Sequence, residues 1–350
     1  MSCSIDQSGN PDLRRNELFP AYEDLRDPRF AALRARFAID QAVAGIEDEF
    51  ARILALRHWI AGRIGIENDH PTPTLHRHAV AILEAAERGG RFHCAHFTVV
   101  QDTVLNAYGH VCRRLGVGPG TLQDGRHHGV NEVWVNALRK WVVVDAKYDL
   151  HYELDGVPLS ALEIRDQVLR DGAAAVKLVY GPERREGPRR GGEDASFYRW
   201  LSWEPGTAAF SSLPCSGQSS LVVLEDEAFR AGTWIRDGKP HWAYEAGFFI
   251  RTGHRSWIEW TPNVLACDLR LEDGLLQVRI DSCTPNLAAY QVSTDGATWQ
   301  ACHELFSLRL PADGIALSLR SLNLAGVAGP PFRLVVRPLP VTGAPQDVRS

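Results

Sequence analysis

The feature of this 350-residue chain that most restricts its fold is a change of hydrophobic period after residue 115. From about residue 94 to residue 115, apolar side chains recur three or four residues apart, which places them on one face of a helix. They are Phe97, Val100, Val104, Tyr108, Val111 and Leu115. The next segments, GVNEVWVN and WVVVDAKYD, are rich in Val and Trp and are joined by ALRK, a pattern typical of a β-hairpin. A buried helix followed by paired strands predicts an α+β fold.

Further helices are expected on both sides of this region. Residues 30–66 carry apolar residues at a helical spacing, and a shorter helix over residues 75–90 is expected to end at Gly89 and Gly90. Downstream, Ser160 is followed three residues later by Glu163, the pattern of a capping box. This pair predicts that a helix begins just after Ser160.

The second half of the chain has a different character. Residues 181–194 collect glycine, proline and charged residues, which indicates a loop or linker. Six of the ten tryptophans lie between residues 197 and 260, at positions 200, 203, 234, 242, 257 and 260. Short alternating segments bounded by Gly, Pro or Asp then predict a small β-sandwich. We therefore expect four parts: a folded domain over 1–180, a linker over 181–195, an aromatic-rich segment over 196–260 packed on that domain, and a sandwich over 261–340.

Composition excludes several classes of partner. The formal charge of -5 comes without any basic run, so nucleic acid is not expected as a partner. No apolar run approaches the roughly 18 to 20 residues needed to span a bilayer, and the first 20 residues lack the apolar core of a signal peptide. The seven cysteines are odd in number and widely spaced, which argues against a disulfide framework. We expect a cytoplasmic protein that acts without a membrane.

Cys94, in the stretch RFHCAHFTVV, is the candidate reactive residue. It lies at the N-terminal edge of the predicted buried helix, where free N–H groups and the positive end of the helix dipole favour a thiolate. Three interpretations compete: a buried apolar residue, a metal ligand together with His93 and His96, and a nucleophile. Adjacent side chains on a helix point apart, and no two cysteines have the CxxC spacing of a zinc site. We therefore expect no metal and no cofactor.

A nucleophilic cysteine needs a base and a group that orients the base. His127 and His128 stand just before the first predicted strand, and Asp145 ends the second. If the two strands pair as a hairpin, the start of one lies beside the end of the other, so an imidazole and a carboxylate come within hydrogen-bond reach. Thiol, imidazole and carboxylate together form the arrangement that acyl transfer requires.

These residues resemble a known pattern. A cysteine that opens a helix, followed by HxxxEV and then by W and D on the next strand, resembles the transglutaminase-like superfamily of papain-like cysteine enzymes. His128 lies four residues before Glu132, and Asp145 lies four residues after Trp141, which fits both spacings. The resemblance covers about residues 45–165. The last part of the chain, with YQVSTDGATWQ and SLNLAGVAGPP, is similar to immunoglobulin-like or fibronectin type III domains.

The resemblance implies a papain-like catalytic core within residues 1–180, followed by a C-terminal sandwich. It implies that Cys94 is the nucleophile, that His128 is the general base and acid, and that Asp145 orients the imidazole. Spacing favours His128 over His127. The backbone N–H of Cys94 would donate to the oxyanion, while the second donor stays unassigned because His93 stands where the superfamily often has glycine or tryptophan. Candidate substrate-binding residues are His93, Asn131, Glu132 and Tyr148.

The function that follows is a cysteine-dependent amide hydrolase or acyltransferase acting through a thioester, on a peptide, amide or glycan-type substrate. An alternative is a carbohydrate-processing or carbohydrate-binding protein that uses the same scaffold with a Trp-rich surface. In that case Glu132 would face Asp145 or Asp149 as paired carboxylates. A third possibility is recognition without catalysis. The sequence leaves the oligomeric state open.

Overall fold

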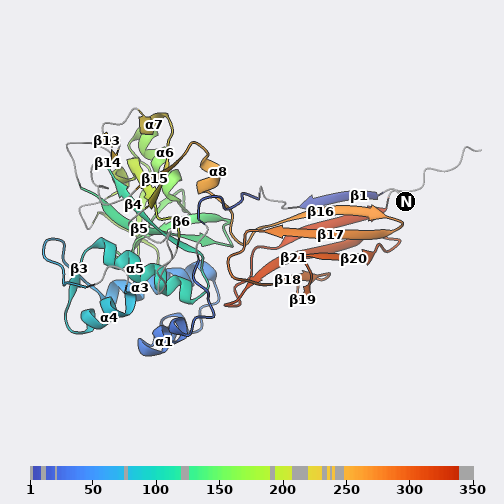
Figure 1. Cartoon of the computed structure of the whole chain (residues 1–350), viewed down its shortest axis with the longest axis horizontal. Coiled ribbons are helices and arrows are strands. Elements are labelled where there is room, and N and C mark those ends of the chain that lie inside the picture. Colours follow the sequence, from blue (N-terminus) through green and yellow to red (C-terminus); the bar gives the residue numbers. More distant parts are fainter. Residues whose placement is uncertain are drawn as a thin grey trace, which may run out of the picture. The chain divides into compact units, whose positions relative to one another are not determined.

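The chain forms two compact units in the computed structural model, one of residues 16–260 and one of residues 1–15 with 261–350 (Figure 1). The structure describes residues 3–8, 13–19, 22–74, 78–119, 126–189, 194–206, 220–230, 235–236, 239–240 and 248–338. The expected first domain began at residue 1, whereas the N-terminal residues belong with the C-terminal unit. The reason is that β1 (Cys3–Ser8) pairs antiparallel with β22 (Phe332–Pro338).

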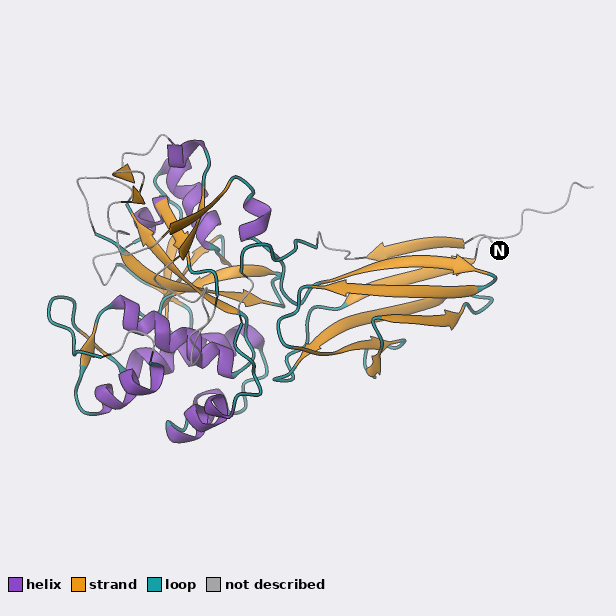
Figure 2. Cartoon of the chain, in the orientation of Figure 1, coloured by secondary structure: helices purple, strands orange, loops and turns teal. Residues whose placement is uncertain are grey.

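The helices α1, α3, α4 and α5 of the first unit lie together on one side of a sheet (Figures 1 and 2). The helical residues are α1 (Pro28–Arg36), α2 (Asp40–Val43), α3 (Glu49–Arg63), α4 (Ala79–Glu87) and α5 (Cys94–Ala107). The segment expected as helical over 30–66 contains three helices. Asp27 and Asp48 cap the starts of α1 and α3 with a side-chain oxygen, whereas α2 begins without a side-chain cap. In the described part of the chain, no helix is long and apolar enough to cross a membrane.

The sheet that these helices cover on one side has six strands in the order β15-β12-β11-β4-β5-β6. Its strands are β4 (Cys112–Gly118), β5 (His128–Val135), β6 (Lys140–Val144), β11 (Trp200–Trp203), β12 (Ser220–Leu224) and β15 (Phe248–Thr252). The predicted hairpin is confirmed: β5 and β6 pair antiparallel, with Asn131 opposite Val144. The mixture of helices and sheets is the expected α+β class.

The helix predicted over residues 94–115 is wrong at its C-terminal end. Helix α5 ends at Ala107, and Gly109 takes a positive φ of 77°, a conformation that suits glycine and reverses the chain. The chain then enters β4 at Cys112, so Leu115 belongs to a strand. Val111 and Leu115 are buried, as expected. A strand that is buried on both faces carries apolar residues without alternation, so these two residues continued the helical spacing by chance.

Shorter elements complete the first unit. A four-stranded sheet has the order β10-β9-β7-β8 and contains β7 (Leu150–Leu154), β8 (Val157–Pro158), β9 (Lys177–Tyr180) and β10 (Arg185–Glu186). Helix α6 (Ala161–Asp171) begins with the predicted capping box of Ser160 and Glu163. The remaining elements are β2 (Gly65–Ile66), β3 (Arg91–Phe92), η1 (Ala195–Arg199), α7 (Glu227–Arg230), β13 (Ile235–Arg236), β14 (Lys239–Pro240) and α8 (Arg255–Ile258). Part of the expected linker is therefore a strand, since β10 pairs with β9.

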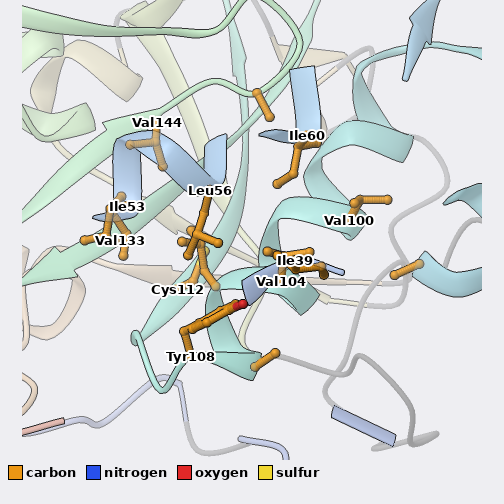
Figure 3. Close-up of a cluster of buried hydrophobic side chains, with 14 of the residues drawn as sticks. Ile39, Ile53, Leu56, Ile60, Val100, Val104, Tyr108, Cys112, Val133 and Val144 are labelled. Atoms are coloured by element: carbon orange, nitrogen blue, oxygen red, sulfur yellow. The ribbon is translucent and has the colours of Figure 1, made fainter. Parts of the chain in front are cut away.

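One hydrophobic core fixes α5 between α3 and the sheet (Figure 3). Its buried side chains come from α3, α5, β5 and β6, and include Ile53, Leu56, Ile60, Val100, Val104, Val133 and Val144. Helix α5 packs directly on β5. The N-terminus of α5 is therefore held at a fixed place relative to the first residues of β5.

The second unit consists of two antiparallel sheets that share one hydrophobic core. Their strand orders are β1-β22-β21-β18-β19 and β16-β17-β20. The strands not yet given are β16 (Leu265–Glu272), β17 (Leu275–Ser282), β18 (Leu287–Ser293), β19 (Gln300–Cys302), β20 (Leu305–Arg309) and β21 (Ile315–Asn323). Leu276 and Ile280 of one sheet and Leu319 and Leu334 of the other are fully buried in that core.

We predict that Leu56→Ala lowers the free energy of unfolding of the first unit by about 2–5 kcal/mol, because a fully buried leucine leaves a cavity. The measurement is urea unfolding followed by tryptophan fluorescence. The control is Leu169→Ala on α6, where the leucine is 38% exposed and the expected change is within about 0.5 kcal/mol. Equal losses in the two variants would contradict the packing described here.

Candidate active site

Cys94 is the first residue of α5 and a free thiol. The residue before it, His93, caps the helix, and its Nδ1 accepts a hydrogen bond of 3.2 Å from the backbone N–H of Ala95. The N–H groups of a first helical turn have no partner inside the helix, and their dipoles favour an anion at this position. The thiol therefore stands where a thiolate is stabilised.

His128 and Asp145 form a buried pair at the same end of the β5–β6 hairpin. The Nε2 atom of His128 lies 2.8 Å from Oδ2 of Asp145, and both side chains are almost fully buried. The other carboxylate oxygen of Asp145 accepts hydrogen bonds from the backbone N–H groups of Lys147 (2.8 Å) and Tyr148 (3.3 Å). Because its second oxygen is held by the turn, the carboxylate can orient the imidazole.

A glycine brings the start of α5 close to this pair. A Cβ atom added to Gly129 would lie 3.3 Å from Cγ2 of Thr98 and 3.8 Å from Cα of Ala95. The first turn of α5 therefore packs against the backbone of β5 one residue after His128. Nδ1 of His128 is buried and has no hydrogen-bond partner in the described part of the chain, and the thiol of Cys94 interacts with the same imidazole.

The electrostatics of the pair favour a thiolate and an imidazolium. Burial acts to raise the pKa of Cys94, but interactions with the side chains of His128 and His93, and the charges of His128 and Lys147, hold this pKa well below the ordinary thiol value. Burial acts to lower the pKa of His128, but the charge and hydrogen bond of Asp145, and the contact with Cys94, raise this pKa to about 10. The thiol is thus poised as a nucleophile at neutral pH.

His127 and Tyr148 differ in their relation to this pair. His127 is exposed, whereas its neighbour His128 is buried against Asp145. The ring of Tyr148 lies 5.5 Å from that of His128, centroid to centroid, and is half-buried. Of the two histidines considered as the base, His127 and His128, the structure therefore pairs only His128 with the carboxylate.

Glu132, predicted to bind substrate, is a buried hub of internal contacts. Its Oε2 accepts hydrogen bonds from Nε and Nη2 of Arg113 (2.9 and 2.6 Å) and from Nε1 of Trp203 (2.8 Å). Its Oε1 accepts one from the backbone N–H of Ala161 (2.7 Å). Four internal donors occupy the carboxylate, so the expectation that Glu132 lines a cleft is replaced by a structural role.

Asn131 and His93, the other two predicted binding residues, both contact α5. Asn131 is fully buried, and its Nδ2 donates to the backbone oxygen of Thr98 (3.1 Å), so it faces the helix and lies away from solvent. The His93 ring packs at 4.2 Å from the ring of His96. Asn131 thus joins β5 to α5. His93 lies next to Cys94 because it is the residue that caps the start of α5.

Two residues near the pair were missed by the sequence interpretation. Gln101 lies seven residues after Cys94 on α5, and its Oε1 accepts a hydrogen bond of 3.1 Å from the backbone N–H of Ala146. Lys147 follows Asp145 by two residues and is buried. The i, i+7 spacing from Cys94 was a signal for Gln101, and the rarity of lysine was a signal for Lys147, one of four in the chain.

Among the described residues, no group of three or more His, Cys, Asp or Glu side chains is arranged to hold a metal ion. His93 and His96, considered with Cys94 as ligands, instead pack ring against ring. The chemistry that the described residues support is nucleophilic attack by a thiolate with proton transfer through an imidazole.

Comparison with known proteins gives distant similarities only. No protein-family model matches the chain, and no curated protein matches it. Among solved structures, the chain is similar to a "putative cysteine protease" from Cytophaga hutchinsonii, with 14% identity, a TM-score of 0.27, and coverage of 51% of this chain and 58% of that one. It is also similar to red sea bream transglutaminase, with 13% identity, a TM-score of 0.31, and coverage of 83% of this chain and 55% of that one. The chain spans less than two thirds of the length of either.

We predict that Glu132→Ala lowers the free energy of unfolding by about 3–5 kcal/mol, because it leaves the buried guanidinium of Arg113 without its counter-charge. Urea unfolding measures the loss. The matched control is Glu87→Ala, which removes the exposed ion pair with Arg36 and is expected to cost about 1 kcal/mol or less. If both variants lose the same stability, the internal role of Glu132 is wrong.

Proposed function

We propose that this chain is a cysteine-dependent amide hydrolase or acyltransferase of the transglutaminase-like superfamily, with Cys94, His128 and Asp145 as its catalytic residues. The observation that carries the proposal is the buried hydrogen bond between Nε2 of His128 and Oδ2 of Asp145, which leaves Nδ1 for the thiol at the start of α5. The order of helix, strand and strand along the chain is the order in which the superfamily pattern presents the same three residue types.

The mechanism follows from these positions. The Cys94 thiolate attacks the amide carbon, and the carbonyl electron pair moves to oxygen. When the tetrahedral intermediate collapses, the C–N bond breaks and Nδ1–H of the His128 imidazolium gives its proton to the leaving amine, which leaves a thioester on Cys94. The neutral imidazole then takes a proton from water or from an acceptor amine as that molecule attacks the thioester. The C–S bond breaks, Cys94 leaves as the thiolate, and the thiolate–imidazolium pair is restored. Asp145 holds the imidazole in the required orientation throughout.

We propose hydrolysis as the main outcome, on peptide, amide or glycan-type substrates. The finer description of the fold belongs to the same proposal: the papain-like core lies within residues 16–180, residues 196–260 are a segment packed on it, and the second unit is an immunoglobulin-like sandwich with an accessory role. Two antiparallel sheets around one core support the second part.

The carbohydrate alternative has less support. Trp200, Trp203 and Trp260 are buried, Trp257 is 39% exposed, and Trp234 and Trp242 lie outside the described residues. Most of the described tryptophans therefore pack inside the unit, and they do not line its surface. The carboxylates proposed for a glycosidase are also occupied, since Glu132 has four internal donors and Asp149 is bound by Arg57 (2.8 Å) and His58 (2.6 Å).

The first test is chemical modification and substitution of Cys94. We expect iodoacetamide at pH 7 to alkylate Cys94 faster than Cys302, because burial raises the pKa of Cys302 whereas the pKa of Cys94 is held low. Peptide mapping by mass spectrometry measures both rates. Cys94→Ala is expected to reduce hydrolysis of chromogenic amides by at least about 10³-fold, with Cys302→Ala as the unaffected control. Activity that survives Cys94→Ala would overturn the proposal.

The pH dependence gives a second test. Activity is expected to appear as pH rises through the lowered pKa of Cys94, below the usual thiol range, because the thiolate is the nucleophile. It is expected to fall as pH rises through about 10, where His128 loses the proton that it must give to the leaving amine. The kcat/KM profile measures both limbs. In Asp145→Asn the alkaline limb should move to lower pH, since the carboxylate is the partner that raises the pKa of His128.

A further inference from the structure

Lys147 is a buried cation next to the proposed catalytic residues. It is 4% exposed, and its backbone N–H donates to the carboxylate of Asp145, which also binds His128. Its Nζ donates to Oδ1 of Asn68 at 2.9 Å and lies 4.8 Å from the centroid of the Tyr148 ring. That ring in turn packs on His128. The backbone and the side chain of Lys147 are therefore both held at the edge of the candidate site.

Two short paired strands end close to Asn68, the partner of this ammonium, and close to Cys94. Strands β2 and β3 pair in parallel, with Ile66 opposite Phe92. The pairing continues by one hydrogen bond, from the N–H of Glu67 to the oxygen of Phe92 (2.9 Å). Asn68 directly follows Glu67, and Cys94 follows Phe92 by two residues, so both come just after the point where this pairing ends. The amide that holds Nζ of Lys147 thus belongs to a segment that is hydrogen-bonded to the backbone two residues before Cys94.

Within the described residues, the ammonium uses one of its hydrogen-bond donors. An ammonium carries three N–H donors, and one of them is directed to Asn68. In the parts of the chain that the structure describes, no carboxylate lies within ion-pair distance of Nζ. A buried cation without a counter-charge is costly unless an anion forms nearby. The charge of Lys147 also contributes to the low pKa of Cys94, which agrees with its position.

We propose that Nζ of Lys147 is the second oxyanion donor of the site, acting together with the backbone N–H of Cys94. The inference rests on the proposed thiol mechanism. As the bond between Sγ of Cys94 and the substrate carbon forms, the carbonyl π bond breaks and its electron pair moves to the oxygen. That oxygen accepts hydrogen bonds from the two donors. When the carbonyl bond forms again, the C–N bond breaks and the amine leaves with the proton from His128.

The experiment separates stabilisation of an oxyanion from stabilisation of a thiolate. Hydrolysis of p-nitrophenyl acetate passes through an oxyanion, whereas alkylation by iodoacetamide requires only the thiolate. In Lys147→Met we expect kcat/KM for the ester, corrected for the Cys94→Ala background, to fall about 10²- to 10³-fold. The rate of Cys94 alkylation at a pH where the thiolate is fully formed should change by less than about tenfold. The control is Lys177→Met, which removes an exposed lysine on β9.

A second variant guards against misfolding of the first. Asn68 is exposed, so Asn68→Ala leaves the core intact and removes only the group that holds Nζ. We expect it to lower ester hydrolysis about 5- to 10-fold, the size of one lost hydrogen bond, with no change in alkylation. An equal loss of hydrolysis and alkylation, a rise in KM alone, or no loss in either variant would overturn the role of Lys147. If Cys94→Ala itself retains activity, the proposed function fails instead, and the two failures are distinct.

Discussion

The buried ion pair between Arg113 and Glu132 joins β4 to β5 and anchors both strands to the rest of the first unit. Arg113 also donates to the backbone oxygen of Ile258 in α8 (2.6 Å), and Glu132 accepts from the start of α6 and from Trp203 of β11. The guanidinium lies over the ring of Trp141 at 3.9 Å, which excludes water from the pair. Because β5 begins at His128, the contacts that fix Glu132 also fix the position of the imidazole.

The candidate site depends on the contact between the start of α5 and the start of β5, which meet at Gly129. Helix α5 is held by the core on its inner face, and β5 is held by the ion pair, so the approach of the helix start to Gly129 decides how near Cys94 lies to His128. The charges there are balanced. Asp145 and a thiolate carry negative charge, while His128 as imidazolium and Lys147 carry positive charge. That balance offsets the cost of holding Asp145, His128 and Lys147 away from bulk water.

Local elements were predictable where local chemistry determines them. The capping box at Ser160 and Glu163, the end of α4 near Gly89, and the β5–β6 hairpin follow from short-range propensities. The C-terminal part of the predicted 94–115 helix failed because a strand buried on both faces carries no distinct period, so β4 looked like more helix. The sequence interpretation also missed β1, because this strand pairs with β22 near the other end of the chain and no local pattern shows that pairing.

The sequence by itself determined the types of reactive group and their order: a cysteine at a helix start, a histidine at the start of one strand and an aspartate at the end of the next. Spacing along a helix or hairpin is a short-range property, so it can be interpreted from the sequence without the tertiary structure. Only the tertiary structure decided the environments of Glu132 and Lys147, two charged residues that lie in or next to the predicted hairpin. Glu132 became an internal anchor because Arg113 and Trp203 converge on it. Lys147 is held at the edge of the candidate site because its backbone binds Asp145 and its Nζ binds Asn68, which follows β2. Such convergence depends on contacts between distant segments, which no local pattern encodes.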